Sequence, residues 1–124
     1  MKPQSQYQPQ FIKAIPWDKI EEHYSQLIVD HGFEFQNILS LVQYISNTGL
    51  SEKLFGYTSL HKLVITIYDT PEWNRESLHV ELETATGKVY FTYHSKPFEK
   101  VVERCYNEDE IISGFIKYVK MLKW

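Results

Sequence analysis

Residues 60–106 read LHKLVITIYDTPEWNRESLHVELETATGKVYFTYHSKPFEKVVERCY, and the rest of the chain can be interpreted around them. Three segments in this stretch are rich in β-branched and aromatic residues that alternate with polar ones: Leu60–Tyr68, Leu78–Glu83 and Lys88–His94. Alternation with a period of two is typical of strands that are buried on one face. A fourth segment, Glu99–Tyr106, has no cleanly apolar face and suits an edge strand, where charges deter further pairing. The pattern predicts an antiparallel β-meander of about four strands.

The ends of the loops predict which residues of the meander lie opposite each other. If Asp69–Glu76 is a loop, His79 lies opposite Thr66; if Thr84–Gly87 is the next loop, His79 also lies opposite Thr92. A slip of one residue would place charged side chains in the core, so the pattern specifies the register strongly.

Both registers assign the strand residues to the same two faces. The apolar face, which we expect to be covered, collects Leu63, Ile65, Ile67, Leu78, Val80, Leu82, Val89, Phe91 and Tyr93. The other face, which we expect to be open to solvent, collects Lys62, Val64, Thr66, Tyr68, His79, Glu81, Glu83, Lys88, Tyr90, Thr92 and His94. Antiparallel sheets commonly cover one face and leave the other in water.

The segments outside the meander favour amphipathic helices. One begins near Pro16 and ends at Gly32, and a more apolar one covers Glu34–Asn47. The last carries an apolar stripe after an Asn107–Glu110 capping arrangement. The stretch Leu50–Ser59 predicts either a short extra strand or a bent start of the first strand.

The predicted fold class is therefore α+β: a two-layer sandwich in the order α-α-β-β-β-β-α, with the helices on one face of the sheet. We expect residues 1–10, which are rich in Gln and Pro, to form a flexible N-terminal tail, and residues 11–124 to form a single domain.

Composition excludes several classes of function. The 124 residues include 13 Lys and Arg against 16 Asp and Glu, which gives a net charge of −3 and argues against a nucleic-acid-binding protein. Cys105 is the single cysteine, so no disulfide can form within the chain. The start of the sequence lacks the apolar region of a signal peptide, and no apolar run approaches the length of a membrane span. These features predict a cytoplasmic protein that does not bind membranes.

The leading functional hypothesis is a non-enzymatic domain that binds another protein through the open sheet face and the loop around Trp73. Tyr, Trp and Arg are the residues that dominate binding energy at protein interfaces, and no catalytic motif, cofactor motif or clustered metal-ligand spacing accompanies them. The predicted partner-binding residues are Tyr68, Trp73, Arg75, His79, Glu81, Tyr90, Thr92 and His94. Formation of a homodimer through the same face is a variant of this hypothesis.

In its small size, mild acidity, α+β pattern and lack of a catalytic motif, the chain resembles the immunity proteins that neutralise bacterial toxins. The resemblance lies in general character, and no sequence motif contributes to it. It implies a cytosolic inhibitor that acts by binding a toxin.

Two alternatives belong to other classes of function. His79 and His94 are expected on neighbouring strands of the open face with Glu81 nearby, which could support a hydrolase or a metal-dependent enzyme. The second alternative is a small-ligand-binding protein with an aromatic pocket where Leu54–Tyr57 meets the helices.

Overall fold

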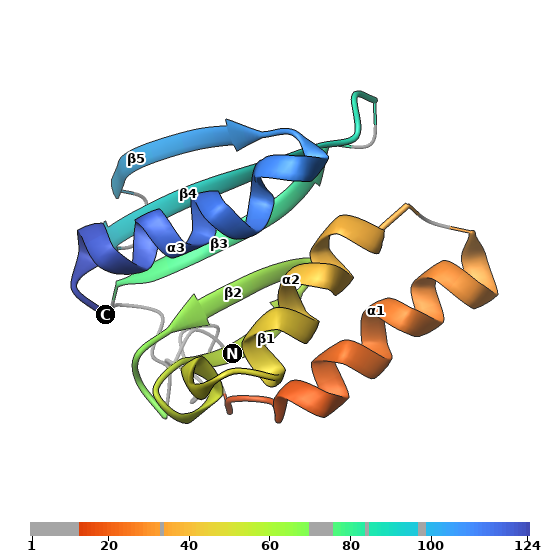
Figure 1. The fold of residues 1–124 in the computed structure, drawn as a ribbon, viewed down its shortest axis with the longest axis horizontal. Coiled ribbons are helices and arrows are strands. Elements are labelled where there is room, and N and C mark those ends of the chain that lie inside the picture. Colours follow the sequence, from red (N-terminus) through yellow and green to blue (C-terminus); the bar gives the residue numbers. More distant parts are fainter. Residues whose placement is uncertain (1–12, 33, 70–75, 84, 97–98) are drawn as a thin grey trace, which may run out of the picture.

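A computed structural model describes residues 13–32, 34–69, 76–83, 85–96 and 99–124 (Figure 1). The predicted tail at residues 1–10 lies outside these residues. The elements run in the order α1 (Trp17–His31), α2 (Gln36–Ser46), the 3₁₀ helix η2 (Gly49–Glu52), β1 (Phe55–Ser59), β2 (Lys62–Thr66), β3 (Ser77–Glu83), β4 (Lys88–Lys96), β5 (Glu99–Tyr106), the 3₁₀ helix η3 (Glu108–Glu110) and α3 (Ile111–Leu122).

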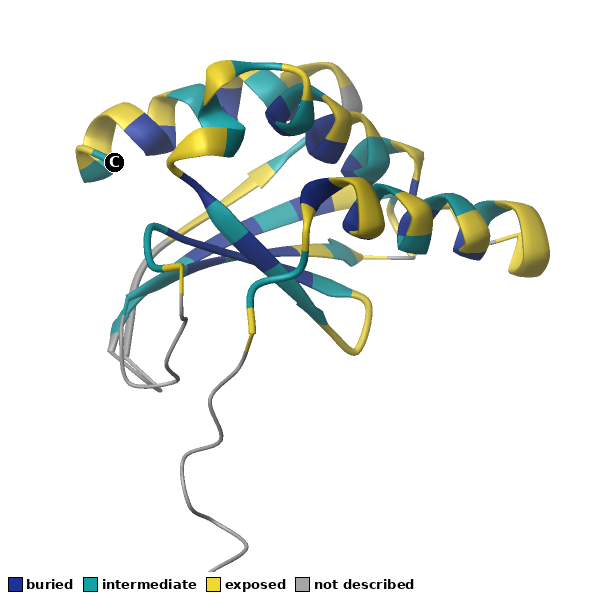
Figure 2. Ribbon diagram, turned by 90° about the horizontal axis from the view of Figure 1, so that it is seen from below, coloured by how far each residue is buried: buried dark blue, intermediate teal, exposed yellow. Residues whose placement is uncertain are grey.

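The architecture is a two-layer α+β sandwich, as the sequence predicts. The strands form one antiparallel sheet in the order β1-β2-β3-β4-β5, and α1, α2 and α3 all lie on the same side of it (Figure 2). The sheet has five strands where about four were expected. The additional strand is β1, which comes from the ambiguous stretch Leu50–Ser59 and pairs with β2.

The start of the first predicted strand was wrong. Leu60 and His61 do not continue a strand but form the turn between Ser59 and Lys62, which lie opposite each other. Both turn residues have positive φ, 52° and 67°, which is the requirement of the type I′ turn that suits a twisted two-residue hairpin. The Tyr24 hydroxyl donates a hydrogen bond of 2.9 Å to the His61 carbonyl, so α1 holds this turn in place. The His61 side chain is exposed.

The predicted register is confirmed for β3 with β4, where His79 lies opposite Thr92. The predicted register of β2 with β3 was wrong by two residues, because His79 lies opposite Val64 and not opposite Thr66. The reason is that β2 ends early: the Thr66 hydroxyl accepts a hydrogen bond from the Tyr68 amide and donates one to the Tyr68 carbonyl, both 3.1 Å long. This local turn takes residues 67 and 68 out of the sheet. An even shift keeps every side chain on its face, so the predicted faces are unchanged.

The covered face of the sheet forms the core with the apolar stripes of the helices. Leu63, Ile65, Leu78, Val80, Val89 and Phe91 are completely buried, and Ile67, Leu82 and Tyr93 pack against them at the margin. All nine were predicted for this face. The helices contribute the buried residues Trp17, Ile20, Tyr24, Leu27, Ile38, Leu41, Val42, Ile45, Ile111, Phe115, Tyr118 and Val119.

The capping arrangement before α3 is confirmed, since the Glu110 carboxylate accepts a hydrogen bond of 3.2 Å from the backbone N–H of Asn107. Gly114 is unusual within α3 because glycine lowers the stability of a helix interior. A Cβ atom at Gly114 would lie 2.6 Å from the ring of Tyr106, the last residue of β5. The missing side chain therefore allows α3 to approach the end of β5 closely.

Replacing Gly114 with Ala tests this close approach. In an unobstructed helix interior the change would stabilise the protein by roughly 1 kcal/mol. Here we expect a loss of about 1–3 kcal/mol in the free energy of unfolding, measured by urea denaturation, because the new methyl group overlaps the Tyr106 ring. The control is Gly49→Ala, since a Cβ atom there meets nothing within 4 Å. Stabilisation by Gly114→Ala would contradict the packing of Tyr106 on this helix.

Replacing Leu60 with Asn tests the strain in the hairpin turn. Leu60 is 98% exposed, so its side chain loses almost no contact on substitution. Asn adopts positive φ more readily than Leu, and we expect Leu60→Asn to raise the free energy of unfolding by about 0.5–1 kcal/mol. Leu60→Ala removes the same exposed side chain without that preference and is expected to leave stability nearly unchanged. Equal changes in the free energy of unfolding for the two substitutions would show that relief of backbone strain does not cause the stabilisation.

Candidate functional site

The candidate site is the sheet face opposite the helices, and the registers arrange its residues in rows that cross the strands. The central row runs Tyr57, Val64, His79, Thr92 and Glu103, one residue from each strand. Because opposite residues in antiparallel strands have Cβ atoms about 4.5–5.5 Å apart, each side chain of the row can contact the next.

This face is less open than the sequence predicts. Val64, Thr66 and Thr92 are only 1%, 3% and 6% exposed, although α1, α2 and α3 lie on the other side of the sheet (Figure 2). Thr92 also donates a hydrogen bond of 3.1 Å to the Glu103 carboxylate. The predicted partner-binding residue Thr92 therefore offers little accessible surface of its own.

Side-chain contacts on this face join Ser77, His79 and His94 into a cluster. The Ser77 hydroxyl and His79 Nε2 are 3.0 Å apart and share a hydrogen bond. The rings of His79 and His94 have centroids 4.3 Å apart and planes inclined by 48°. Both histidines are half-buried. The sequence placed the two histidines on neighbouring strands, and the structure brings their rings into contact.

The charge state of His79 follows from this environment. Burial is the main cause that lowers the pKa of His79, and the positive charge of Lys62 and the neighbouring His94 lower it further, to about 4. His79 is therefore neutral at physiological pH. A neutral imidazole lets the two rings stay in contact without charge repulsion, and it accepts or donates a hydrogen bond to Ser77 according to its tautomer.

Glu81 and Tyr90 lie opposite each other toward the other end of β3 and β4, where Glu81 is exposed. Tyr90 in turn lies opposite Cys105 on the edge strand β5. Hydrogen bonding between these two side chains is the main cause that raises the pKa of the Tyr90 hydroxyl, so this phenol is neutral at physiological pH. Cys105 is exposed here.

The remaining predicted residues do not join the histidine cluster. Tyr68 lies after the end of β2, and its hydroxyl donates a hydrogen bond of 3.2 Å to Glu76, which also accepts one from Tyr93. This arrangement ties the end of the β2–β3 connection to β4. Trp73 and Arg75 lie outside the residues that the structure describes.

Sequence reasoning missed the contribution of Ser77, Tyr57 and Glu103 to this face. Ser77 carried a detectable signal, since it lies two residues before His79 on a predicted face. Tyr57 could not be assigned because the sequence left open whether its stretch forms a separate strand, and Glu103 could not be assigned because the register of β5 was unknown.

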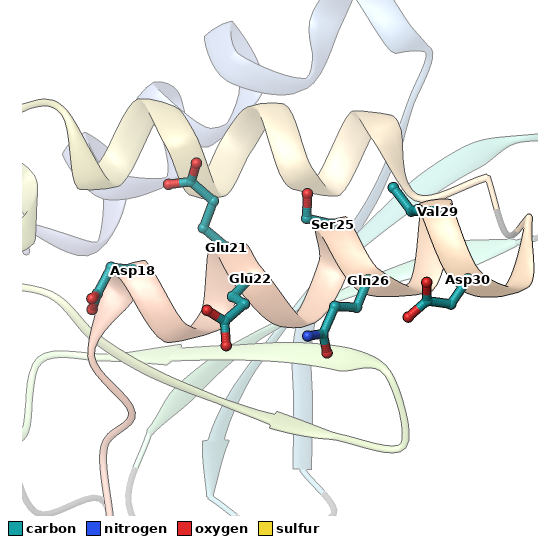
Figure 3. A pocket seen from close by; sticks show the side chains of 7 residues that line it. All are labelled: Asp18, Glu21, Glu22, Ser25, Gln26, Val29 and Asp30. Atoms are coloured by element: carbon teal, nitrogen blue, oxygen red, sulfur yellow. The ribbon is translucent and has the colours of Figure 1, made fainter.

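A second surface feature is the exposed side of α1, which lines a shallow hollow of about 530 Å³ (Figure 3). Glu21, Ser25 and Val29 form the row nearer to α2, where Gln43 donates a hydrogen bond of 3.4 Å to Glu21. Four carboxylates gather along this side and make it the negative face of the helix. They belong to Asp18, Glu21, Glu22 and Asp30.

The described residues contain no group of three or more His, Cys, Asp or Glu side chains placed to hold a metal ion. Within the same residues, no helix combines the length and the apolar character needed to cross a membrane.

The lowered pKa of His79 predicts a specific pH dependence of stability. The histidine binds a proton near pH 6.5 in the unfolded chain but only near pH 4 in the folded protein. Its contribution to stability is therefore complete above pH 6.5 and is lost as the pH falls toward 4. Because the side chain is partly exposed, we expect the loss to be about 1–2 kcal/mol in urea denaturation between pH 7 and pH 4.

The variant His79→Gln is expected to remove this part of the pH dependence. His31→Gln is the matched control, because His31 is exposed in the last turn of α1. If the stability of His79→Gln and that of the unmodified protein depend on pH in the same way, the burial of His79 does not cause the loss of stability between pH 7 and pH 4.

Comparison of the chain with protein-family models, with curated proteins and with solved structures gave no match. The functional assignment of this chain therefore depends on the geometry of its own surface.

Proposed function

We propose that this chain is a small protein-binding domain that acts through the sheet face opposite the helices. The main support is the cluster of Ser77, His79 and His94, which is held by a hydrogen bond and a ring contact before any partner arrives. Ordering of side chains and removal of water oppose binding at most interfaces. Both costs are reduced where side chains are already packed together and half-buried, as they are here.

The borders of this face resemble the polar rim of a protein interface. Glu81 and Glu103 are exposed, and Lys62 lies on the same face with the opposite charge. Mixed charges around a partly desolvated centre orient a partner and exclude wrong ones more than they add affinity. A small inhibitor of the immunity type, which acts by occupying a surface of its target, fits this arrangement and the net charge of −3.

A hydrolase is the second candidate, and the Ser77–His79 hydrogen bond is the observation that favours it. A serine within 3.0 Å of a histidine is the geometry of a nucleophile and its general base. However, a base with a pKa of about 4 is weak at neutral pH. No carboxylate among the described residues is hydrogen-bonded to His79 to orient it. We therefore rank hydrolysis second, and covalent labelling of Ser77 by a fluorophosphonate would reverse that order.

Site-specific photo-crosslinking tests the binding face. A benzoyl-phenylalanine is introduced at Tyr90, on the proposed face, and the protein is irradiated in lysate of its source cells. We expect one discrete adduct, which is lost on competition with protein that lacks the cross-linker. The protein in this adduct is then identified and purified, and we expect His94→Ala to weaken its binding about tenfold, as at an interface hot spot.

The matched control carries the same cross-linker at Lys117, an exposed residue of α3 on the opposite side of the molecule. Adduct formation from position 117 but not from position 90 would place the binding surface on the helical layer. Unchanged affinity of a folded His94→Ala variant would exclude the histidine cluster as its centre.

A further inference from the structure

Two histidines meet where α1 packs against the turn between β1 and β2. His23 lies in the first half of α1, and His61 is the second residue of the turn. The centroids of their rings are 5.5 Å apart, and the ring planes are inclined by 30°. We call these two residues the α1–turn histidine pair. Because His23 belongs to a helix, the pair lies on the helical side of the sheet, whereas His79 and His94 lie on the opposite face.

Aromatic core residues hold both members of the pair. The Tyr24 hydroxyl binds the His61 carbonyl at 2.9 Å, and the centroid of the Tyr24 ring lies 5.1 Å from that of His23. On the other side, the centroid of the Phe35 ring lies 6.0 Å from that of His61. Tyr24 and Phe35 are buried and contact each other, with ring centroids 5.5 Å apart. The two imidazoles are therefore positioned by the core before any ligand binds, which lowers the entropic cost of binding.

The Nε2 atom of His23 points to a ligand. It is buried and has no hydrogen-bond partner in the part of the chain that the structure describes. Such a nitrogen has lost its hydrogen bond to water without replacing it, which costs free energy. In contrast, Nε2 of His79 shares a hydrogen bond with Ser77. Neutral imidazole nitrogen is the commonest metal ligand in proteins, so a metal ion at His23 would supply the missing partner.

The spacing of the pair suits two ligands of one zinc ion. Zn–N bonds of about 2.0–2.1 Å in a tetrahedral arrangement place the centroids of two histidine rings roughly 5–5.5 Å apart. The observed 5.5 Å agrees with this distance. His61 is exposed, so an ion can approach the pair from solvent. Among the described residues no third His, Cys, Asp or Glu joins the pair, and the remaining coordination positions are therefore left to water.

We propose that the α1–turn histidine pair binds Zn²⁺ through Nε2 of His23 and one ring nitrogen of His61. With two protein ligands, the affinity is weaker than that of a structural zinc site with four. The bound ion links α1 to the β1–β2 turn and stabilises the folded chain, because the unfolded chain does not bring the two rings together. This site is independent of the sheet face proposed above, since the two share no residue.

The test is a titration of the full chain with Zn²⁺ at pH 7.5, where an imidazole is mostly neutral. It is followed by ¹H–¹⁵N NMR of the histidine ring nitrogens. We expect the ring signals of His23 and His61 to shift and those of His31, His79 and His94 to stay in place. We also expect Zn²⁺ to raise the urea concentration at the midpoint of unfolding. Mg²⁺, which prefers oxygen ligands, is expected to change neither measurement.

Two variants remove one ligand each. His23→Gln and His61→Asn are expected to lower the affinity for Zn²⁺ about tenfold or more, since loss of even an outer-shell partner of a metal-binding histidine costs about 10–100-fold. Asn is chosen at position 61 because it adopts the positive φ of this turn readily. His31→Gln removes an exposed histidine from the last turn of α1, and His79→Gln removes one ring of the other histidine pair. Both controls are expected to leave the affinity unchanged.

The proposal is overturned if the ring signals of His23 and His61 do not move with Zn²⁺, or if Mg²⁺ moves them equally. It is also overturned if His79→Gln lowers the affinity as much as His23→Gln does, because the ion would then lie at the opposite face of the sheet. The ring signals of the unmodified chain decide the question even if a variant fails to fold.

Discussion

Strands β2, β3 and β4 send alternate side chains into one apolar layer, and the arrangement of the molecule depends on covering that layer. The helix-facing residues of β2, β3 and β4 are completely buried beneath α1, α2 and α3. At roughly 25 cal/mol per Å² of apolar surface removed from water, this is the largest stabilising contribution that the chain can make. All three helices lie on this side of the sheet, and the candidate site lies on the other.

Aromatic side chains with a polar end fasten the helices to the sheet. The Trp17 indole binds the Leu54 carbonyl, the Tyr24 hydroxyl binds the His61 carbonyl, and the Tyr118 hydroxyl binds the Phe91 carbonyl at 3.2 Å. Burial raises the pKa of Tyr24 and of Tyr118, so both remain neutral donors. Each bond satisfies a backbone acceptor that would otherwise lose its water, and each fixes the position of a helix more narrowly than apolar contact alone.

The face opposite the helices is intermediate in character between a buried core and a solvated surface. Its centre is too buried for a solvated surface, as the 1% exposure of Val64 shows, yet its borders carry exposed charges. The low pKa of His79 arises from this partial burial and makes the histidine a poor base. The same environment suits a rigid contact surface, and so the physical chemistry that weakens a catalytic role favours a binding role.

The sequence by itself determined the α+β class, the two faces of the sheet, the register of β3 with β4, and the helix stripes. These depend on periodicity and on short turns, which are local properties of the chain. It left open whether Leu50–Ser59 forms a separate strand, and it did not reveal the turn at Leu60, because a positive φ at Leu is disfavoured locally and is stabilised by tertiary contacts such as the Tyr24 hydrogen bond. The register suggested that His79 and His94 lie close together, but it did not predict the burial of His79 or the hydrogen bond of His79 with Ser77. Only the tertiary structure decided these features, because burial and side-chain contact depend on elements that are distant in the sequence.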